Sequence, residues 1–396
     1  MKNQLLHTPD GVRDIYNGEC KKKLELQNNL LTSLREFGYQ DIQTPSFEYF
    51  DVFGNQIGTT PSRDLYKFFD KNGNTLVLRP DFTPSIARCA VKYYMDDDMP
   101  VKLCYMGNTF TNSSEYQGRF KEVTQCGAES IGDASIYADA EILAMTVDAL
   151  KKSGLKEFQI SVGHSQFFSG LIQAADIDED TAEELKEYLL NKNFFGVEEI
   201  LHNYNIEENL MQLFALLGKF DASSEDICNA MEVSKKYPKI YKALQDLALL
   251  YDCLKIYQID KYISYELGII SDYHYYTGII FAGYTFGTGE AIVKGGRYDK
   301  LLKQFGRDCP AIGFAIVVDQ LMAALTRQKL DIPVADNTVY LVYKKDCYNR
   351  AIKKAISLRQ KGAYVETILW DETHSQKDYE ERATRNNVKK VEFMEN

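Results

Sequence analysis

Polar residues that could hold a small charged molecule recur at the ends of the apolar segments of this chain. They comprise two carboxylates, an amide, a hydroxyl and three phenols: Asp81, Thr83, Gln125, Glu129, Tyr275, Tyr276 and Tyr298. Carboxylates accept hydrogen bonds from an ammonium group, and amide and phenol groups orient a ligand through further hydrogen bonds. These residue types therefore predict a site for a zwitterion.

The residues alone leave a structural alternative open for each member of this set. Thr83 precedes Pro84 and suits the cap of a helix whose first position is that proline. Glu129 could pair with an arginine at the surface, and tyrosines are common in sheets for packing reasons. The five histidines are scattered, and the chain has neither a phosphate-binding glycine loop of the Walker or dinucleotide kind nor a serine elbow. The set above is thus the main candidate for a site.

Composition excludes several classes of protein. A length of 396 residues predicts two or three domains, and a hydrophobic content of 45% allows a large core. The net charge of −11 argues against nucleic acid as a partner, because affinity for a phosphate backbone depends on Lys and Arg. The 8 cysteines include no C-x-x-C pair, which indicates reduced thiols and a cytoplasmic protein. No export signal or apolar membrane span is visible, so we expect no membrane association, and we also expect no metal and no cofactor.

The elements that must position the polar residues follow from local patterns. Leucines at helical spacing predict a helix over residues 20–37, and an extended segment follows at 41–45. A short strand over 76–80 leads into a helix that begins near Pro84, and residues 107–129 form a hairpin that ends in Gln125 and Glu129. A further helix begins at Tyr137. The polar residues therefore stand at strand ends and at one helix start.

The second half of the chain changes character twice. Residues 174–260 are rich in Glu, Leu, Lys and Ala and predict an inserted helical subdomain. Residues 265–293 favour strands, and the apolar stretch from Gly313 predicts a buried helix. After Pro333 the pattern alternates strand, helix, strand, helix, strand, which indicates a small three-layer α/β unit. We expect one domain over 1–328 and another over 335–396.

Several segments, in the same order along the chain, resemble the signatures of class II aminoacyl-tRNA synthetases and specifically of histidyl-tRNA synthetase. They are Gly38-Tyr39 through Pro45 and Glu48, Arg79-Pro80-Asp81-Phe82-Thr83, Gly118-Arg119 through Glu129, Tyr275-Tyr276-Thr277, Gly295-Gly296-Arg297-Tyr298-Asp299, and Pro310 to Ala315. The resemblance implies an α+β fold with an antiparallel sheet and flanking helices. It also implies that the seven polar residues bind histidine, and that the chain forms a self-dimer through residues 34–53.

Three arginine positions of the synthetase pattern are altered in this chain. In the synthetases, arginines that contact the ATP phosphates or act in histidine activation stand at the positions of Thr111, Ser271 and Gln320. Arginine clamps a phosphate with a planar fork and stabilises charge that develops during transfer, which Thr, Ser and Gln cannot do. The resemblance therefore implies that the histidine half of the site remains and the nucleotide half is lost, with no catalytic residues.

This combination resembles the family of regulatory subunits of ATP phosphoribosyltransferase. The resemblance implies a hetero-oligomer with the short-form catalytic subunit, which needs this chain for activity, and feedback inhibition by histidine. The short tail after Pro333, against roughly 100 residues in a typical domain, agrees with the absence of a full anticodon-binding domain. Two alternatives remain open, a divergent histidyl-tRNA synthetase and a histidine-sensing module that acts on another effector.

Overall fold

The computed structural model describes residues 4–54, 60–94, 100–112, 120–204, 206–270, 275–334 and 337–395. Two compact units are present: the first contains residues 1–13 and 26–331, and the second contains residues 14–25 and 332–396. In the part of the chain that is described, no helix is both long and apolar enough to cross a membrane. The domain limits of 1–328 and 335–396 stay a prediction.

Before residue 332 the chain forms ten α-helices and eleven strands within the described ranges. The helices are α1 (Asn17–Glu36), α2 (Thr83–Tyr93), α3 (Ile136–Lys152), α4 (Ser165–Ala174), α5 (Glu179–Leu190), α6 (Phe194–Leu201), α7 (Glu208–Ala215), α8 (Ser224–Ser234), α9 (Pro238–Ile256) and α10 (Val318–Arg327). The strands are β1 (Gln40–Asp41), β2 (Phe47–Tyr49), β3 (Lys67–Phe69), β4 (Thr75–Leu78), β5 (Val101–Phe110), β6 (Glu122–Ile131), β7 (Phe158–His164), β8 (Ile263–Tyr265), β9 (Ile279–Thr285), β10 (Val293–Arg297) and β11 (Ala311–Val317).

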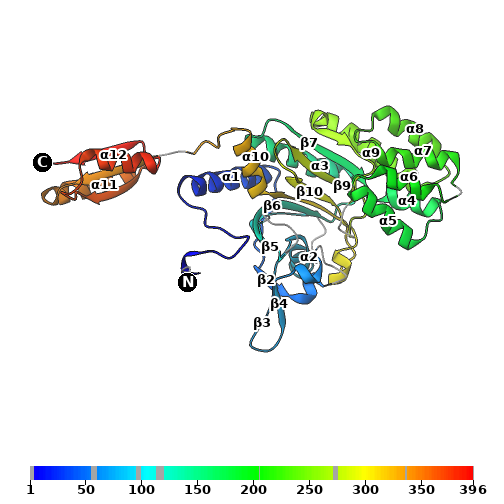
Figure 1. Ribbon diagram of the computed structural model, residues 1–396, viewed down its shortest axis with the longest axis horizontal. Coiled ribbons are helices and arrows are strands. Elements are labelled where there is room, and N and C mark those ends of the chain that lie inside the picture. The colour runs from blue at the N-terminus through cyan, green and yellow to red at the C-terminus, as the bar shows by residue number, and fades with distance from the viewer. Residues whose placement is uncertain are drawn as a thin grey trace. The chain divides into compact units, whose positions relative to one another are not determined.

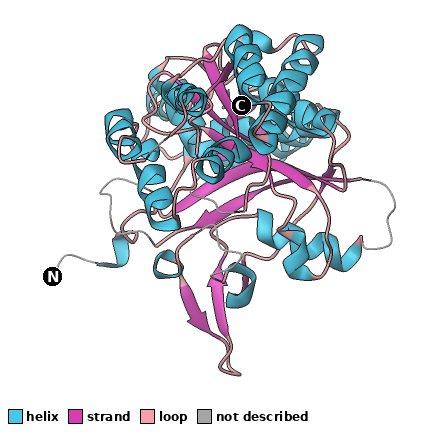
Figure 2. Ribbon diagram, turned by 90° about the vertical axis from the view of Figure 1, so that its right-hand side faces the viewer, coloured by secondary structure: helices cyan, strands magenta, loops and turns pink. Residues whose placement is uncertain are grey.

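A large mixed sheet forms the centre of the first unit. Its eight strands follow the order β1-β5-β6-β11-β10-β9-β7-β8, and all inner pairs are antiparallel, whereas the outermost pair at each edge is parallel. A separate three-stranded sheet, β2-β4-β3, lies below the large sheet in Figure 2. Strand β6, which contains Gln125 and Glu129 at the end of the predicted hairpin, pairs with both β5 and β11. These two residues therefore lie in an inner strand of the large sheet.

Helices pack on the sheet and on one another. Helix α3 packs against β6 and β11, and α9 packs against α3, α4, α8 and β7, so the helices α4 to α9 gather beside β7 and β9 (Figure 1). Phe82, directly before helix α2, and Ile86 and Ala90 of the helix pack in a buried cluster with Leu103 and Tyr105 of β5. This cluster holds the start of α2 against β5 of the large sheet.

One sequence expectation is wrong here. Residues 311–317 form strand β11, and the helix begins only at Val318. A short apolar run has the same composition in a buried strand as in a buried helix, so periodicity could not separate the two. Residues 311–317 are extended because they pair with β6 on one side and with β10 on the other.

The second unit contains a three-stranded parallel sheet with a helix on each face. Its elements are β12 (Thr338–Tyr343), α11 (Tyr348–Gln360), β13 (Tyr364–Leu369), α12 (Gln376–Arg385) and β14 (Lys390–Met394), in the sheet order β13-β12-β14. Tyr340 packs with Ala383 of α12, whereas the next residue, Leu341, packs with Ala351 and Ala355 of α11. Successive residues of a strand face opposite sides, so the expected three layers are present.

Candidate functional site

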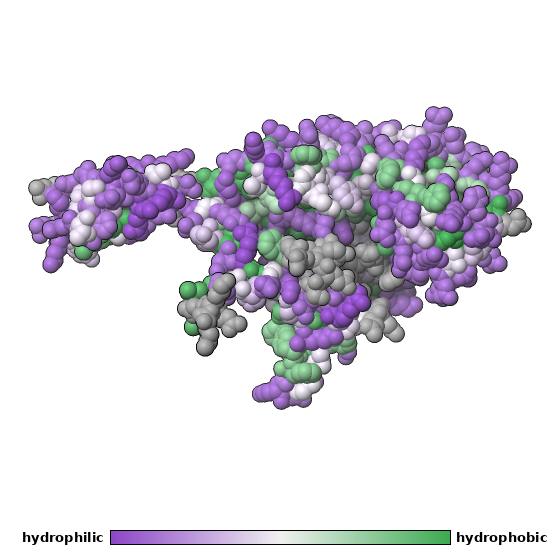
Figure 3. Space-filling model, in the orientation of Figure 1, coloured by the Kyte–Doolittle hydropathy of each residue, from purple (hydrophilic) through white to green (hydrophobic). Residues whose placement is uncertain are grey.

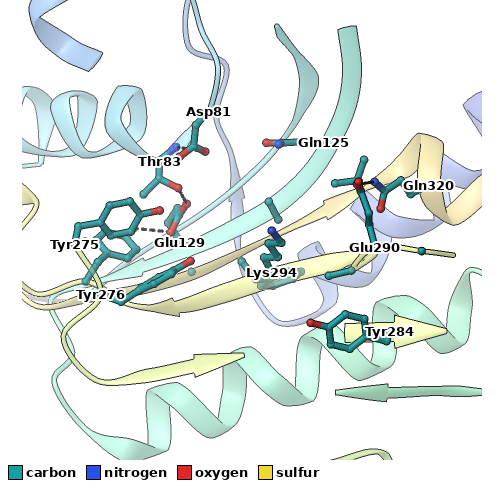
Figure 4. A pocket seen from close by; sticks show the side chains of 17 residues that line it. Asp81, Thr83, Gln125, Glu129, Tyr275, Tyr276, Tyr284, Glu290, Lys294 and Gln320 are labelled. Atoms are coloured by element: carbon teal, nitrogen blue, oxygen red, sulfur yellow. Dashed lines mark hydrogen bonds between the residues drawn. The ribbon is translucent and has the colours of Figure 1, made fainter. Parts of the chain in front are cut away.

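All seven polar residues of the predicted site line one cavity of about 440 Å³ in the first unit. Figure 4 shows Asp81, Thr83, Glu129, Tyr275 and Tyr276 together at one end, with Glu290 and Gln320 at the other. The residues come from the segment that leads into α2 and its first residue, from β6, from the segment before β9 and from the position directly after β10. Folding therefore joins segments that lie far apart in the sequence.

Glu129 occupies the centre of the first end and is only 1% exposed. The Thr83 hydroxyl donates to its Oε1 at 2.8 Å, and the Tyr298 hydroxyl donates to its Oε2 at 2.5 Å. Across the strand pair, Glu129 lies opposite Gly313 of β11, where an added Cβ would lie 1.6 Å from Oε2. Glycine at 313 therefore makes room for the carboxyl group, which is a close approach that no other residue permits.

Burial sets the ionisation of this end of the cavity. Desolvation raises the pKa of Glu129 to about 8, and the nearby charge of Asp81 acts in the same direction. The hydrogen bonds from Tyr298 and Thr83 lower this pKa and offset the increase only in part. Burial, followed by the charge of Glu129, holds the pKa of Tyr298 well above its ordinary value, so its phenol remains a donor. A ligand that brings a positive charge would favour the ionised form of Glu129.

Three tyrosines form the wall beside Glu129. The rings of Tyr275 and Tyr276 lie 4.8 Å apart, and Tyr275 meets Tyr298 edge-on at 5.8 Å. Tyr276 packs over Gly296 of β10, where an added Cβ would come within 2.8 Å of the ring. The wall is apolar in its faces and polar at its hydroxyls, which suits an aromatic or heteroaromatic side chain of a ligand.

The other end of the cavity is built differently. The Gln320 amide nitrogen donates to Glu290 at 2.8 Å, and this contact is exposed. Tyr284, Glu290 and Lys294 also line the cavity, and none of the three was predicted from the sequence. Lys294 could have been found from its place two residues before Gly296 on a strand, because that spacing puts both residues on one face.

The structure rejects two of the structural alternatives. Thr83 is the first residue of α2, not its cap, and its hydroxyl donates to Glu129, while its backbone N–H donates to Asp81 at 3.3 Å. Glu129 pairs with no surface arginine, because its two oxygens accept from Thr83 and Tyr298 inside the protein. Tertiary contacts decide both cases.

Two of the three positions that depart from the synthetase pattern can be placed. Gln320 lines the cavity, whereas Thr111 does not, and the Thr111 backbone N–H donates to the Lys121 carbonyl. Ser271 lies outside the described residues, as does the 113–119 part of the predicted hairpin. The functional loss at these positions therefore remains a proposal.

The two arginines of the matching segments that the structure describes, Arg79 and Arg297, have structural roles. Arg79 donates to the carbonyls of Asn108 and Thr44, each at 2.8 Å, and so joins β4 to β5. Arg297 donates to the buried carboxylate of Asp139 in α3 at 2.9 Å and to the Ser135 carbonyl. They hold the frame of the cavity and do not line it.

No metal or disulfide chemistry is built into the described residues. These residues contain no group of three or more His, Cys, Asp or Glu that could hold a metal ion, and all eight cysteines are free thiols. What the cavity offers is recognition: an acidic, buried end, a tyrosine wall, an amide from Gln125 and a single lysine among the described lining residues. This arrangement can bind an amino acid.

Comparison with known proteins defines the class. A sequence profile described as histidyl-tRNA synthetase matches residues 11–321. The structure is also similar to that of histidyl-tRNA synthetase from Nostoc, with a TM-score of 0.79 and 20% identity over 97% of this chain and 90% of the other, which shows the fold. The chain has the class II synthetase fold, and the predicted fold class is confirmed.

Other comparisons identify the family more narrowly. ATP phosphoribosyltransferase regulatory subunits from Acetivibrio thermocellus and Clostridium kluyveri are 36% and 35% identical to this chain, over 93% and 96% of it and 88% and 97% of the relatives. A Bacillus halodurans structure described as an ATP phosphoribosyltransferase regulatory subunit/histidyl-tRNA synthetase gives a TM-score of 0.87 at 29% identity, with 99% of each chain covered. The chain belongs to the family of ATP phosphoribosyltransferase regulatory subunits.

Proposed function

We propose that the chain is a non-catalytic, cytoplasmic subunit that assembles with the short-form catalytic subunit of ATP phosphoribosyltransferase. In this proposal the catalytic subunit needs the chain for activity, and the chain conveys feedback inhibition by histidine. The family supports the regulatory role. The cavity supports the identity of the ligand, and it is the observation on which the proposal chiefly depends.

Histidine fits the chemistry of the cavity. Its ammonium group would lie nearest the carboxyl groups of Asp81 and Glu129, since two neighbouring carboxyl groups attract a cation. Its ring would face Tyr275 and Tyr276, whose rings present both apolar faces and hydroxyls. Gln125 lines the same space, and its buried Oε1 accepts no hydrogen bond from any described residue. An amide acceptor of this kind is available to a ligand N–H.

The opposite end supports the view that no adenylate forms. A synthetase needs preorganised cations around the ATP phosphates, and the loss of one such donor typically costs a hundredfold or more in rate, roughly 3 kcal/mol. Here Gln320 donates to the carboxylate of Glu290, and a carboxylate repels a triphosphate. Thr111 and Ser271 supply no positive charge either.

Binding of histidine regulates only if it favours one arrangement of the assembled subunits. By linkage, the substrates of the transferase must then weaken histidine binding by the same factor. Couplings of this kind are typically on the order of 1–3 kcal/mol, which gives several-fold to about hundredfold inhibition.

A self-dimer belongs to the same proposal. Apolar residues gather on the small sheet β2-β4-β3 (Figure 3), where Phe47, Tyr49, Phe68 and Phe69 are exposed. The first two lie within the predicted contact segment 34–53. Exposed aromatic groups of this kind are typical of interaction surfaces, and a closed twofold pair is the commonest assembly.

The test compares the purified chain alone with its complex with a short-form catalytic subunit. We expect histidine binding by calorimetry, inhibition of the complex by histidine, and no histidine-dependent exchange of pyrophosphate into ATP by the chain. Exchange at synthetase-like rates would instead establish the divergent synthetase. Histidine binding without any effect on the complex would favour a sensor that acts on another effector.

A further inference from the structure

Lys294 stands in the middle of the cavity floor. It belongs to β10, where its cross-strand neighbours are Ala282 of β9 and Ala315 of β11. These small neighbours leave open space around the lysine. Figure 4 shows its side chain rising into the cavity between Tyr276 and Glu290, below Gln125.

The charge of Lys294 is not neutralised within the described protein. It forms no ion pair or hydrogen bond with any residue that the structure describes. An adjoining cavity of about 170 Å³ is lined by Lys294 and by a second lysine, Lys192, but Lys192 is ion-paired with the buried carboxylate of Glu266. Among the described lining residues of the larger cavity, Lys294 is therefore the cation available to a ligand.

Strand register places this cation at a useful distance from Glu129. Glu129 lies opposite Gly313, and Gly313 lies opposite Gly296, which is two residues from Lys294 on the same face. Strand spacings of about 4.8 Å and rises of about 3.3 Å per residue separate the two Cα atoms by about 12 Å. Both residues line the same cavity, so an amino acid bound there would lie between them.

We propose that the Lys294 ammonium group binds the α-carboxylate of a free amino acid whose α-ammonium group is held by Asp81 and Glu129. This inference rests on the proposed amino-acid ligand and adds that the site recognises the α-carboxylate of that ligand. The cavity then recognises both charges of a zwitterion. A ligand whose carboxyl group is reduced to an alcohol or esterified lacks the anion and loses the contact with Lys294.

The selectivity follows from charge pairing. A charge-assisted hydrogen bond is roughly twice as strong as a neutral one. We expect the intact chain to prefer histidine over histidinol, its alcohol analogue, by about tenfold. Arginine at 294 would preserve a cation, whereas methionine would preserve only the length and apolar volume of the side chain.

The experiment measures binding of histidine and histidinol to the full chain by calorimetry. Lys294→Met is expected to weaken histidine binding about tenfold, to change histidinol binding less than twofold, and so to abolish the preference. Lys294→Arg is expected to retain it. Lys303→Met, which changes an exposed lysine outside the cavity, serves as the matched control, and thermal melting checks that every variant folds.

Two results would overturn this inference in different ways. If the intact chain binds histidine but Lys294→Met weakens both ligands equally or neither, the carboxylate contact is absent while the proposed amino-acid site stands. If the intact chain binds neither ligand, the proposed function of the cavity fails, and the role of Lys294 fails with it.

Discussion

The two ends of the cavity differ in how firmly the fold holds their polar groups. Glu129 is buried and accepts hydrogen bonds from two residues of other segments. Gly313, opposite it on β11, has no side chain and so leaves room for the carboxyl group. The contact between Gln320 and Glu290 is a single exposed hydrogen bond between side chains. A buried polar group without its partners is costly, so the first end is constrained by stability as well as by recognition, and the second is not.

The largest effect is expected from removal of the buried carboxyl group. Glu129→Ala should weaken histidine binding by roughly thirtyfold or more, since loss of one partner of a buried charge pair costs about 2–5 kcal/mol. Calorimetry provides the measurement, and Glu290→Ala, at the other end, is the matched control with less than about a twofold change. Equal effects of the two substitutions would remove the distinction between the ends.

Histidine binding should depend on pH through the same group. Because burial raises the pKa of Glu129 to about 8, the carboxyl group is largely protonated at pH 7 in the free protein. Binding of an ammonium group favours the ionised form, so affinity should rise by up to about tenfold per pH unit below pH 8. Calorimetry in buffers of different ionisation enthalpy should detect release of a proton.

Stability of the ligand-free protein should change in the opposite direction. The unfolded chain releases the Glu129 proton near its ordinary pKa of about 4.3, whereas the folded chain keeps it until about pH 8. The stabilisation from this group is complete below about pH 4.3 and declines up to about pH 8. The melting temperature of Glu129→Gln, relative to the parent, should therefore increase between pH 6 and pH 8. A constant difference would contradict the raised pKa.

A smaller effect is expected from the hydroxyl that supports the carboxyl group. Tyr298→Phe removes the donor to Glu129 Oε2 but keeps the ring against Tyr275. A hydrogen bond of this kind contributes about 0.5–1.5 kcal/mol, so histidine affinity should fall roughly three- to tenfold. Tyr284→Phe, which changes another hydroxyl of the lining, is the control and should have no comparable effect.

The smallest effect is expected at the far end. Gln320→Arg should change histidine affinity less than about twofold, because the residue lies away from Glu129 and its contact is exposed (Figure 4). It should also produce no pyrophosphate exchange, since one cation does not rebuild a phosphate site that lacks the others. Exchange activity in this variant would show that the nucleotide half of the site is nearly intact.

Much of the fold could be predicted because its signals are local. Helical spacing of leucines indicated α1, and the alternating pattern after Pro333 indicated each element of the second unit. The seven polar residues were found because their types suit a zwitterion and because their segments resemble a known family. Lys294 was missed because a lysine on a strand is usually an exposed side chain, and the signal available in the sequence was its spacing of two residues from Gly296, which places both on one face.

The sequence by itself determined the order of the elements, the polar residue types of the site and the absence of arginine at Thr111, Ser271 and Gln320. Only the tertiary structure decided that residues 311–317 are a strand and that Glu129 is buried. It also decided that the Thr83 hydroxyl donates to Glu129 and does not cap a helix. The reason is physical: side-chain direction in a strand depends on its register with neighbours far away in sequence, and burial shifts a pKa only after those neighbours have excluded water.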